Sequence, residues 1–503
     1  MELPGRAASY WLEIDRPEFE PLAGGAKVDV AIVGGGWVGV LTADLLKRAG
    51  RTVALIEGRR VGGQVTGHTS AKLTSLHSLI YAELARNFGD TTARLYGEAN
   101  QAGIDWVERI AAERGIDCEF ARVPAYSYSE TGGRLADIHA EVEVATRLGL
   151  PASFSRELPL PFSVAGAVRF DHQARFHPLK FLLPIAASVA GDGSLVCEHT
   201  RVFGVEAGNP HRVLTHRGTV WARDVVIATN LPFMLEGLHF ARVFPQRHAL
   251  LASRLAPGSL PEGMFVGVEA PSHSIRPHPD AQGGVLVTVG PPFKTGQGDM
   301  AEQFTALERF TRERFDVQEV LLRWGNQDYF SPDRMPFVGK LSTTTRRLYV
   351  ATGFSAWGLA NGVAAAQVLG DHILERRNPW AELYDATRYH LRITGKQLLR
   401  ENFAIGKGWV TDHVRSWRLP DVCDVRRGEG AVCRRNGIPV AVYKGEDGTN
   451  HYLSPFCPHL NCMVSWNGAE KSWDCPCHGS RFSASGELIE GPAVRDLESR
   501  EEE

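Results

Sequence analysis

Apolar residues near the start of the chain occur in two short runs, with a glycine-rich turn and a helical pattern between them. Residues 28–33 are mostly β-branched and apolar, which is typical of a strand buried on both faces of a parallel sheet. After the turn, apolar side chains recur at helical spacing until Gly50. Residues 53–56 form the second apolar run. The order of these elements predicts a β-α-β unit.

Strand and helix patterns continue to alternate as far as about residue 377. Strands are expected at residues 126–129, 167–170, 225–229, 284–290 and 348–351, and helices at residues 178–190, 300–315 and 359–374. From about residue 419 the pattern changes to short strands separated by turns of glycine and asparagine. The sequence therefore predicts an α/β (α+β) body at residues 27–377, a docking linker at residues 378–418 and a small all-β domain at residues 419–503.

The composition excludes several classes of protein. A chain of 503 residues is long enough for roughly two to four domains. Its net charge of −3 gives no basic excess for binding nucleic acid or an anionic membrane. No apolar run reaches the length of a membrane span, and the start lacks the basic and then apolar order of a secretory signal. We therefore expect a cytoplasmic protein with no nucleic-acid partner and no membrane span.

The turn after residue 33 has the spacing G-x-G-x-x-G at Gly34, Gly36 and Gly39. Between a strand and a helix, these glycines allow a tight bend, close approach of the backbone to a pyrophosphate, and close helix–strand packing. The N-terminus of the following helix offers free N–H groups to the phosphates. Glu57 ends the second strand, where its carboxylate can accept hydrogen bonds from ribose hydroxyls. The motif predicts a dinucleotide site and does not by itself distinguish FAD from NAD.

A second candidate site lies near the C-terminus. Four of the eight cysteines fall within 21 residues, interleaved with two histidines; the residues are Cys457, His459, Cys462, Cys475, Cys477 and His478. Because a cytosolic chain seldom keeps structural disulfides, such a cluster first indicates a metal site.

The pairing of C-x-H with C-x-x-H in this cluster resembles the two metal-binding loops of Rieske [2Fe–2S] domains. In those domains two thiolates hold one iron and two imidazoles hold the other. The resemblance implies that Cys457 and Cys475 bind the first iron, and that His459 and His478 bind the second. A zinc ion held by the same four residues is the main alternative, because Zn²⁺ readily takes two cysteines and two histidines.

The Rieske resemblance also implies features around the cluster. In the Rieske proteins of respiratory bc complexes, cysteines at the positions of Cys462 and Cys477 form a disulfide, and we expect the same bridge here. Residues 491–493 (Gly-Pro-Ala) resemble the third loop, which packs over the cluster. Ser480 occupies the place whose hydroxyl usually donates to a cluster sulfide, whereas Phe482 replaces the tyrosine of the highest-potential members. We therefore expect a lower reduction potential than in those members.

The body resembles the FAD-dependent oxidoreductase superfamily of D-amino-acid oxidase, glycine oxidase and sarcosine oxidase. Besides the glycine turn, the likeness is carried by residues 224–230, where a strand ends in Ala-Thr-Asn, by residues 324–339 and by residues 352–358. The resemblance implies FAD as the cofactor. It also implies a discontinuous FAD-binding Rossmann-like domain (roughly 27–115, 185–235 and 320–377) and an interleaved mixed-sheet substrate domain (roughly 116–184 and 236–319).

The same resemblance implies further contacts with the flavin nucleotide. Residues 66–77 are expected to cross the pyrophosphate and the isoalloxazine, with an ordinary hydrophilic loop as the alternative. The turn at residues 352–358 is expected to present a helix N-terminus to the pyrimidine ring, where it would stabilise negative charge. His77 and Arg334 lie near these segments without an assigned role, and the catalytic residues are not predicted. The implied contact residues are Thr69, Ser70, Lys72, Val202, Ala228, Gly353 and Gly358.

Together the two cofactors predict a dehydrogenase that oxidises the C–N bond of an amine or amino acid. Electrons would pass from FAD to the [2Fe–2S] cluster and then to an external acceptor. A reductase fed by NAD(P)H or by a partner protein is one alternative, although the sequence has no second glycine-rich dinucleotide turn. A non-enzymatic redox sensor is another. A Rieske oxygenase would need a mononuclear iron site, for which only Asp171, His172 and His177 suggest ligands.

Overall fold

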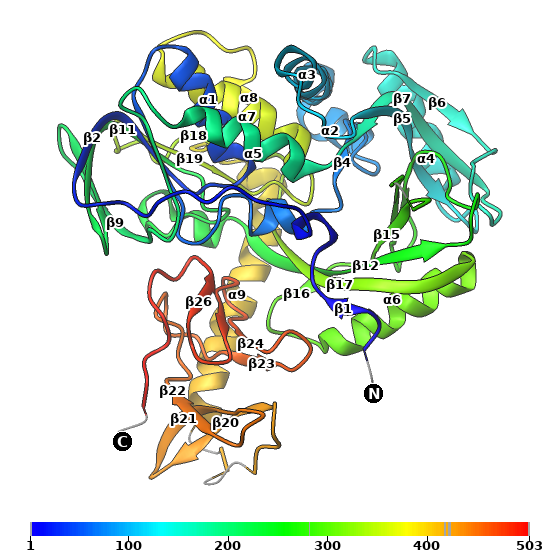
Figure 1. The fold of residues 1–503 in the computed structure, drawn as a ribbon. Coiled ribbons are helices and arrows are strands. Elements are labelled where there is room, and N and C mark those ends of the chain that lie inside the picture. Colours follow the sequence, from blue (N-terminus) through cyan, green and yellow to red (C-terminus); the bar gives the residue numbers. More distant parts are fainter. Residues whose placement is uncertain (1–2, 281, 417–418, 421–423, 501–503) are drawn as a thin grey trace.

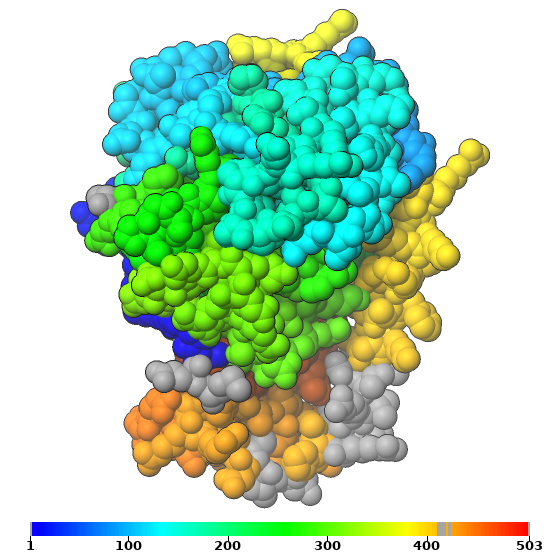
Figure 2. All heavy atoms as spheres, turned by 90° about the vertical axis from the view of Figure 1, so that its right-hand side faces the viewer, coloured from blue at the N-terminus to red at the C-terminus, as the bar shows by residue number. Residues whose placement is uncertain are grey.

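The computed structural model describes residues 3–280, 282–416, 419–420 and 424–500. Figure 1 shows a large body that contains two β-sheets, with a smaller all-β unit beneath it. The long helix α9 (Leu391–Ser416) runs from the body to this C-terminal unit. In the space-filling view, α9 lies at the surface along the side of the body (Figure 2).

The first sheet has eight strands and is parallel through most of its width. Its strand order is β18-β19-β11-β2-β3-β8, and only β18 at the edge of this path runs antiparallel to its neighbour. Two further strands, β9 and β10, extend from β11. The bounds are β2 (Ala26–Val33), β3 (Val53–Ile56), β8 (Leu195–Cys197), β9 (Val202–Glu206), β10 (His211–Thr215), β11 (Gly218–Ile227), β18 (Phe337–Lys340) and β19 (Leu348–Thr352).

Helices cover one face of this sheet because a parallel sheet must bury both faces. Alternate side chains of β2 serve the two faces: Val30 and Ile32 join the helix-side core, and Ala31 and Val33 join the core on the opposite side. The helix-side core is formed by α1 (Trp37–Arg48), α3 (Asp90–Arg114), α5 (Pro178–Val189) and α7 (Gly358–Ile373).

The second sheet has eleven strands and is mixed, with the order β1-β17-β12-β15-β14-β13-β5-β7-β4 and with β16 and β6 attached to β12 and β7. Helix α6 (Met300–Arg314) packs on one face through an apolar cluster, and α2 (Tyr81–Phe88) and α4 (Leu135–Arg147) lie near the β5–β7 end. The strands are β1 (Arg6–Ala7), β4 (Lys72–Leu73), β5 (Ala121–Ser129), β6 (Ala152–Ser155), β7 (Gly166–Arg175), β12 (Phe244–Leu255), β13 (Met264–Gly267), β14 (Ser274–His278), β15 (Val285–Val289), β16 (Phe293–Lys294) and β17 (Val317–Phe330).

The C-terminal unit consists of two small antiparallel sheets around a compact core that includes four cysteines and Trp473. One sheet is formed by β20 (Gly430–Arg435), β21 (Ile438–Lys444) and β22 (Asn450–Leu453). The other is formed by β23 (Ser465–Asn467), β24 (Ser472–Asp474), β25 (Arg481–Ser483) and β26 (Leu488–Glu490). The mixed α/β body and the all-β C-terminal unit confirm the predicted fold class.

Two segments have more regular structure than their sequences suggested. The expected linker contains α8 (Ala381–Tyr384) and all of α9. The N-terminal lead-in adds β1 to the long strand β17 and forms a short 3-10 helix, η1 (Tyr10–Leu12), whose Trp11 is fully buried. Among the residues that the structure describes, none of the helices has the length and apolar character needed to cross a lipid bilayer.

Candidate functional site

A cavity of about 500 Å³ lies where the glycine turn of the first sheet meets the strands of the second. Most of the residues expected to contact a flavin nucleotide line it. These are Gly34, Gly36, Glu57, Thr69, Ser70, Lys72, Val202, Ala228 and Gly358. The cavity therefore joins segments that are far apart in the sequence.

The glycine turn fits closely against the neighbouring backbone. Gly34 has a φ of +108°, and a Cβ there would lie 2.5 Å from the carbonyl oxygen of Ala228. A Cβ at Gly39 would lie 1.9 Å from the carbonyl oxygen of Gly34, so this glycine serves helix packing and does not line the cavity. At Gly36 the nearest atom to such a Cβ is the Thr66 hydroxyl oxygen at 3.5 Å. This backbone leaves room for a pyrophosphate beside the turn.

The Glu57 carboxylate is held at the end of β3 by backbone donors. One oxygen accepts a hydrogen bond from the N–H of Gly35 at 2.7 Å, and the other accepts one from the N–H of Arg59 at 2.8 Å. Burial raises the pKa of Glu57, while these two hydrogen bonds oppose that shift. Arg59, Arg60 and Arg201 also line this part of the cavity, and their positive charges suit a diphosphate.

Two tryptophans hold the loop between β3 and β4. The indole N–H of Trp11 donates to the carbonyl of Thr69 at 2.6 Å, and that of Trp324 donates to the carbonyl of His68 at 2.9 Å. The loop ends in Lys72, whose side chain reaches the cavity. Burial and, to a smaller extent, the nearby Arg276 together lower the pKa of Lys72 to about 7.

The strand β17 supplies another wall of the cavity through Asn326, Asp328 and Phe330. The Asp328 carboxylate accepts a hydrogen bond from the N–H of Tyr329 at 2.8 Å and one from the N–H of Ala356. Burial raises the pKa of Asp328 to about 7. Sequence reasoning missed this residue because its placement depends on the pairing of β17 with β12, which no local motif reveals.

In the C-terminal unit, the four expected cluster ligands come together from two loops. The thiols of Cys457 and Cys475 are buried and lie within hydrogen-bonding distance of each other. The rings of His459 and His478 have centroids 5.0 Å apart, and neither Nδ1 atom has a hydrogen-bond partner among the described residues. Burial lowers the pKa of His459 to about 4 and that of His478 to about 3, so both imidazoles are neutral, as metal ligation requires. These donors fit a [2Fe–2S] cluster of the Rieske type.

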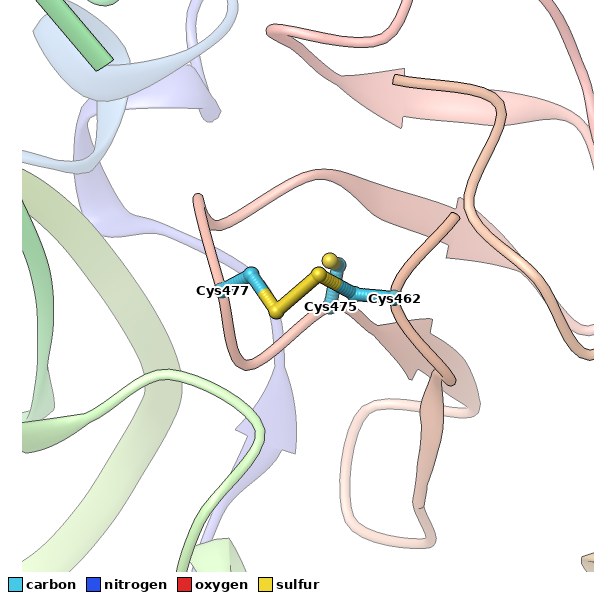
Figure 3. A group of neighbouring side chains, drawn as sticks. All are labelled: Cys462, Cys475 and Cys477. Carbon is cyan, nitrogen blue, oxygen red and sulfur yellow. A yellow bond between two sulfur atoms is a disulfide. The ribbon is translucent and has the colours of Figure 1, made fainter. Parts of the chain in front are cut away.

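The remaining two cysteines of the group form a disulfide, Cys462–Cys477, beside Cys475 (Figure 3). Within the described ranges, the only other grouping of metal-binding side chains combines these same three cysteines. Because two of them share a disulfide, this trio does not offer three thiolates to a metal. Asp171, His172 and His177, the suggested mononuclear iron ligands, form no such group there, and His177 instead caps α5 by accepting from the N–H of Lys180 at 3.2 Å.

One strand separates the two sites. Along β17, Asn326, Asp328 and Phe330 face the cavity, whereas the intervening side chains reach the C-terminal unit. The amide of Gln327 donates to the carbonyl of Gly479 at 2.8 Å, and the hydroxyl of Tyr329 donates to the carbonyl of His478 at 2.8 Å. Because side chains alternate along a strand, one set of β17 side chains faces the cavity and the other set contacts the cluster loops.

Further contacts hold the C-terminal unit against the body. The Phe240 ring meets the rings of His478 and His459 edge-on, with centroid distances of 5.4 Å and 6.0 Å. Arg247, which is 1% exposed, forms an ion pair with Glu470 at 2.6 Å. Residues 488–494 of the C-terminal unit line the cavity themselves. The C-terminal unit therefore completes the wall of the cavity in the body.

Comparison with known proteins identifies both parts of the chain. Residues 29–372 match the family of FAD dependent oxidoreductases, which is more than half of the chain. This chain belongs to that family. Residues 417–501 match the Rieske [2Fe-2S] domain. The protein is thus an FAD-dependent oxidoreductase that carries a C-terminal Rieske domain, and its cofactors are FAD and a [2Fe–2S] cluster, as the sequence predicted.

A relative of this oxidoreductase shares its whole architecture. The Bacillus subtilis (strain 168) protein YhfW, described as a Rieske 2Fe-2S iron-sulfur protein, is 34% identical over 97% of this chain and 96% of its own. Gamma-glutamylputrescine oxidoreductase of Escherichia coli (strain K12) is 24% identical over 78% of this chain and 94% of its own. Among solved structures, glycine oxidase from Geobacillus kaustophilus is similar in fold, with a TM-score of 0.61 and 18% identity over 72% of this chain and 99% of its own.

Three residues named from the sequence lie outside the cavity lining of this oxidoreductase. Gly353 has a φ of +76° and shapes the turn before α7, while Gly39 packs the helix. His77 is buried and stacks on Trp357; its Nε2–H donates to the Thr74 carbonyl at 2.7 Å, and its Nδ1 lies 2.6 Å from the Tyr96 hydroxyl. Arg334 does line the cavity, where it forms an ion pair with Glu83 at 2.9 Å.

Proposed function

We propose that this oxidoreductase is a dehydrogenase that oxidises the C–N bond of an amine or amino acid and passes the electrons through its own Rieske cluster to an external acceptor. The observation that carries the proposal is the shared wall formed by β17. Asp328 faces the cavity, and the next residue, Tyr329, holds the backbone of His478. A cofactor in the cavity and a cluster bound by His478 would lie on opposite sides of one strand.

The amine class is supported by the relatives. Gamma-glutamylputrescine oxidoreductase and glycine oxidase are named for amino compounds, as is the L-amino acid deaminase from Proteus vulgaris, which has a TM-score of 0.60. The bound FAD would supply the two-electron acceptor for C–N oxidation. We propose that the backbone of Gly34 and Gly36 holds its pyrophosphate and that Glu57 holds its ribose.

The same arrangement favours a direct internal route for electrons. The residues proposed as iron ligands are Cys457, His459, Cys475 and His478, with the disulfide Cys462–Cys477 tying their loops together. The match of residues 417–501 to the Rieske [2Fe-2S] domain favours this cluster over a zinc ion. His478 is 4% exposed and lies beneath Phe240, so the cluster's histidine side faces the body. A redox sensor would not need this contact between its cluster and a substrate cavity.

The domain boundaries follow the same proposal. We propose that residues 27–115, 185–235 and 320–377 form the FAD domain, that residues 116–184 and 236–319 form the substrate domain, and that residues 419–503 form the Rieske domain after a linker at residues 378–418. We place the protein in the cytoplasm, with an external electron acceptor as its partner.

The experiment that tests this function is anaerobic mixing of the holoenzyme with a panel of amines and amino acids. We expect bleaching of the flavin absorbance first and reduction of the cluster, followed by EPR, as a second phase. A His478→Ala variant is the control, because it should keep the first phase and lose the second. Reduction by NAD(P)H alone would support a reductase, and no reduction by any small molecule would support a sensor; either result would contradict the proposal.

A further inference from the structure

One carboxyl group in the cavity, that of Asp328, has no role in the proposed binding of FAD. Three acidic residues line the cavity: Glu57, Asp328 and Glu490. Glu57 is the proposed ribose ligand, and Glu490 lies 3.7 Å from the guanidinium of Arg481. Asp328 differs from both, because no lysine, arginine or histidine within the described ranges lies within ion-pairing distance of its carboxylate.

The surroundings of Asp328 fix the carboxylate without neutralising it. Its hydrogen-bond donors are the backbone N–H groups of Tyr329 and Ala356, which hold the carboxylate at the cavity wall. Asp328 is only 5% exposed, and the like charge of Glu490 adds to the cost of burying its own charge. A buried carboxylate without a counter-ion is stabilised when a cation binds next to it. The site therefore suits a positively charged ligand.

The cations of the cavity are poorly placed to hold a substrate carboxylate. The guanidinium of Arg334 is already paired with Glu83 at 2.9 Å. Burial lowers the pKa of Lys72 to about 7, so its side chain is only partly charged near neutral pH. Arg59, Arg60 and Arg201 lie beside the segments proposed to hold the nucleotide. The cations of the cavity would therefore stabilise the α-carboxylate of a substrate bound next to Asp328 only weakly.

We propose that Asp328 is a catalytic residue that binds the ammonium group of the substrate and accepts its proton, so that the substrate is an amine without an α-carboxylate. This inference rests on the proposed function. In the step that follows, an N–H bond of the ammonium breaks and its proton moves to an Asp328 oxygen, which leaves the neutral amine. FAD, when bound, would supply the acceptor for a hydride from the adjacent carbon, which leaves an iminium cation with a C=N bond. Water would then hydrolyse this cation to a carbonyl compound and a protonated amine or ammonium ion.

The test compares Asp328→Asn, which keeps the shape and removes the charge, with Asp328→Glu, which keeps the charge. Substrates are offered in pairs that differ only in the α-carboxylate, such as putrescine with ornithine and ethanolamine with serine. The quantity compared is the rate constant of anaerobic flavin bleaching divided by the dissociation constant of the amine. We expect Asp328→Asn to lower this ratio about 10- to 100-fold, because the variant loses a charged hydrogen bond to the substrate. Asp328→Glu should recover part of this loss.

Three readouts separate this role from a structural one. The rate of bleaching in the wild type should rise with pH through the region near 7 as Asp328 loses its proton, and Asp328→Asn should lack that rise. The FAD content and flavin spectrum of Asp328→Asn should match the wild type. Asp192→Asn removes an exposed carboxylate outside the cavity lining and should keep the amine parameters within about threefold, since surface substitutions have small effects.

Several results would overturn the inference. A changed flavin spectrum or FAD content in Asp328→Asn, with amine binding intact, would mean that Asp328 contacts the cofactor. Bleaching by serine and ornithine but not by their amine partners would refute the amine class and leave the proposed dehydrogenase standing. If neither class bleached the wild-type flavin, the proposed function would fail, and this inference would fail with it.

Discussion

The hydroxyl of Tyr329 offers a single-atom test of the contact between the flavin cavity and the cluster. Tyr329 is 1% exposed, and its hydroxyl donates to the carbonyl of His478 at 2.8 Å, with a longer contact of 3.4 Å to the carbonyl of Gly491. Tyr329→Phe keeps the ring and its packing and removes only this donor. The carbonyl of His478 then remains buried without the hydrogen bond that satisfied it.

The expected cost follows from that loss. A buried acceptor left without its donor costs about 1–3 kcal/mol, and each 1.4 kcal/mol is about a tenfold change in an equilibrium. The hydroxyl links β17 to the loop of His478 and, at longer range, to Gly491, so this energy is lost from the contact between the body and the Rieske domain. We expect flavin-to-cluster transfer to slow by about 5- to 100-fold, because the contact that holds the two sites together is populated less.

The assay follows both chromophores in one anaerobic stopped-flow experiment. Flavin bleaching by substrate should keep its wild-type rate in Tyr329→Phe, while cluster reduction becomes slower. Tyr349→Phe is a matched control, since this buried tyrosine contacts Asp224 at 3.4 Å in the first sheet and does not contact the Rieske domain. An unchanged second phase, or equal slowing of both phases, would refute the reasoning.

Three further predictions concern the cluster, the domain contact and the glycine turn. Phe482→Tyr should raise the cluster potential by about 60 mV if the new hydroxyl donates to the cluster, since about 1.4 kcal/mol equals 59 mV for one electron; an EPR-monitored redox titration with no rise would count against this. Glu470→Gln leaves the buried Arg247 without its ion pair and should cost about 3 kcal/mol, measured by denaturant unfolding; stability within 0.5 kcal/mol of the wild type, roughly the effect of a surface change, would contradict it. Gly39→Ala places a Cβ 1.9 Å from the Gly34 carbonyl and should abolish FAD binding, measured by flavin absorbance, whereas yellow protein with full FAD content would disprove the packing argument.

The features predictable from the sequence are those encoded by neighbouring residues. The glycine turn, the strand before it and the two Cys/His loops each depend on a few consecutive positions, and the structure has β2, α1 and β3 where the pattern indicated them. The same holds for α6, whose apolar spacing is helical over residues 300–314. Local chemistry sets local structure in these segments.

Other features depend on pairing over long distances and left no local signal. Trp11 belongs to a segment that looked irregular, yet its indole holds the carbonyl of Thr69, 58 residues away. Asp328 reads as an ordinary strand residue until β12 pairs with β17 and turns it toward the cavity. Residues 378–418 carry few strand signals and so predict a linker, whereas the structure forms the long helix α9 there.

Residues 488–494 are translated after every other residue that lines the cavity, and they complete its wall. We expect a chain truncated before them to leave the cavity open on this side and to bind the nucleotide more weakly. We therefore expect retention of the flavin to depend on folding of the Rieske domain around its cluster.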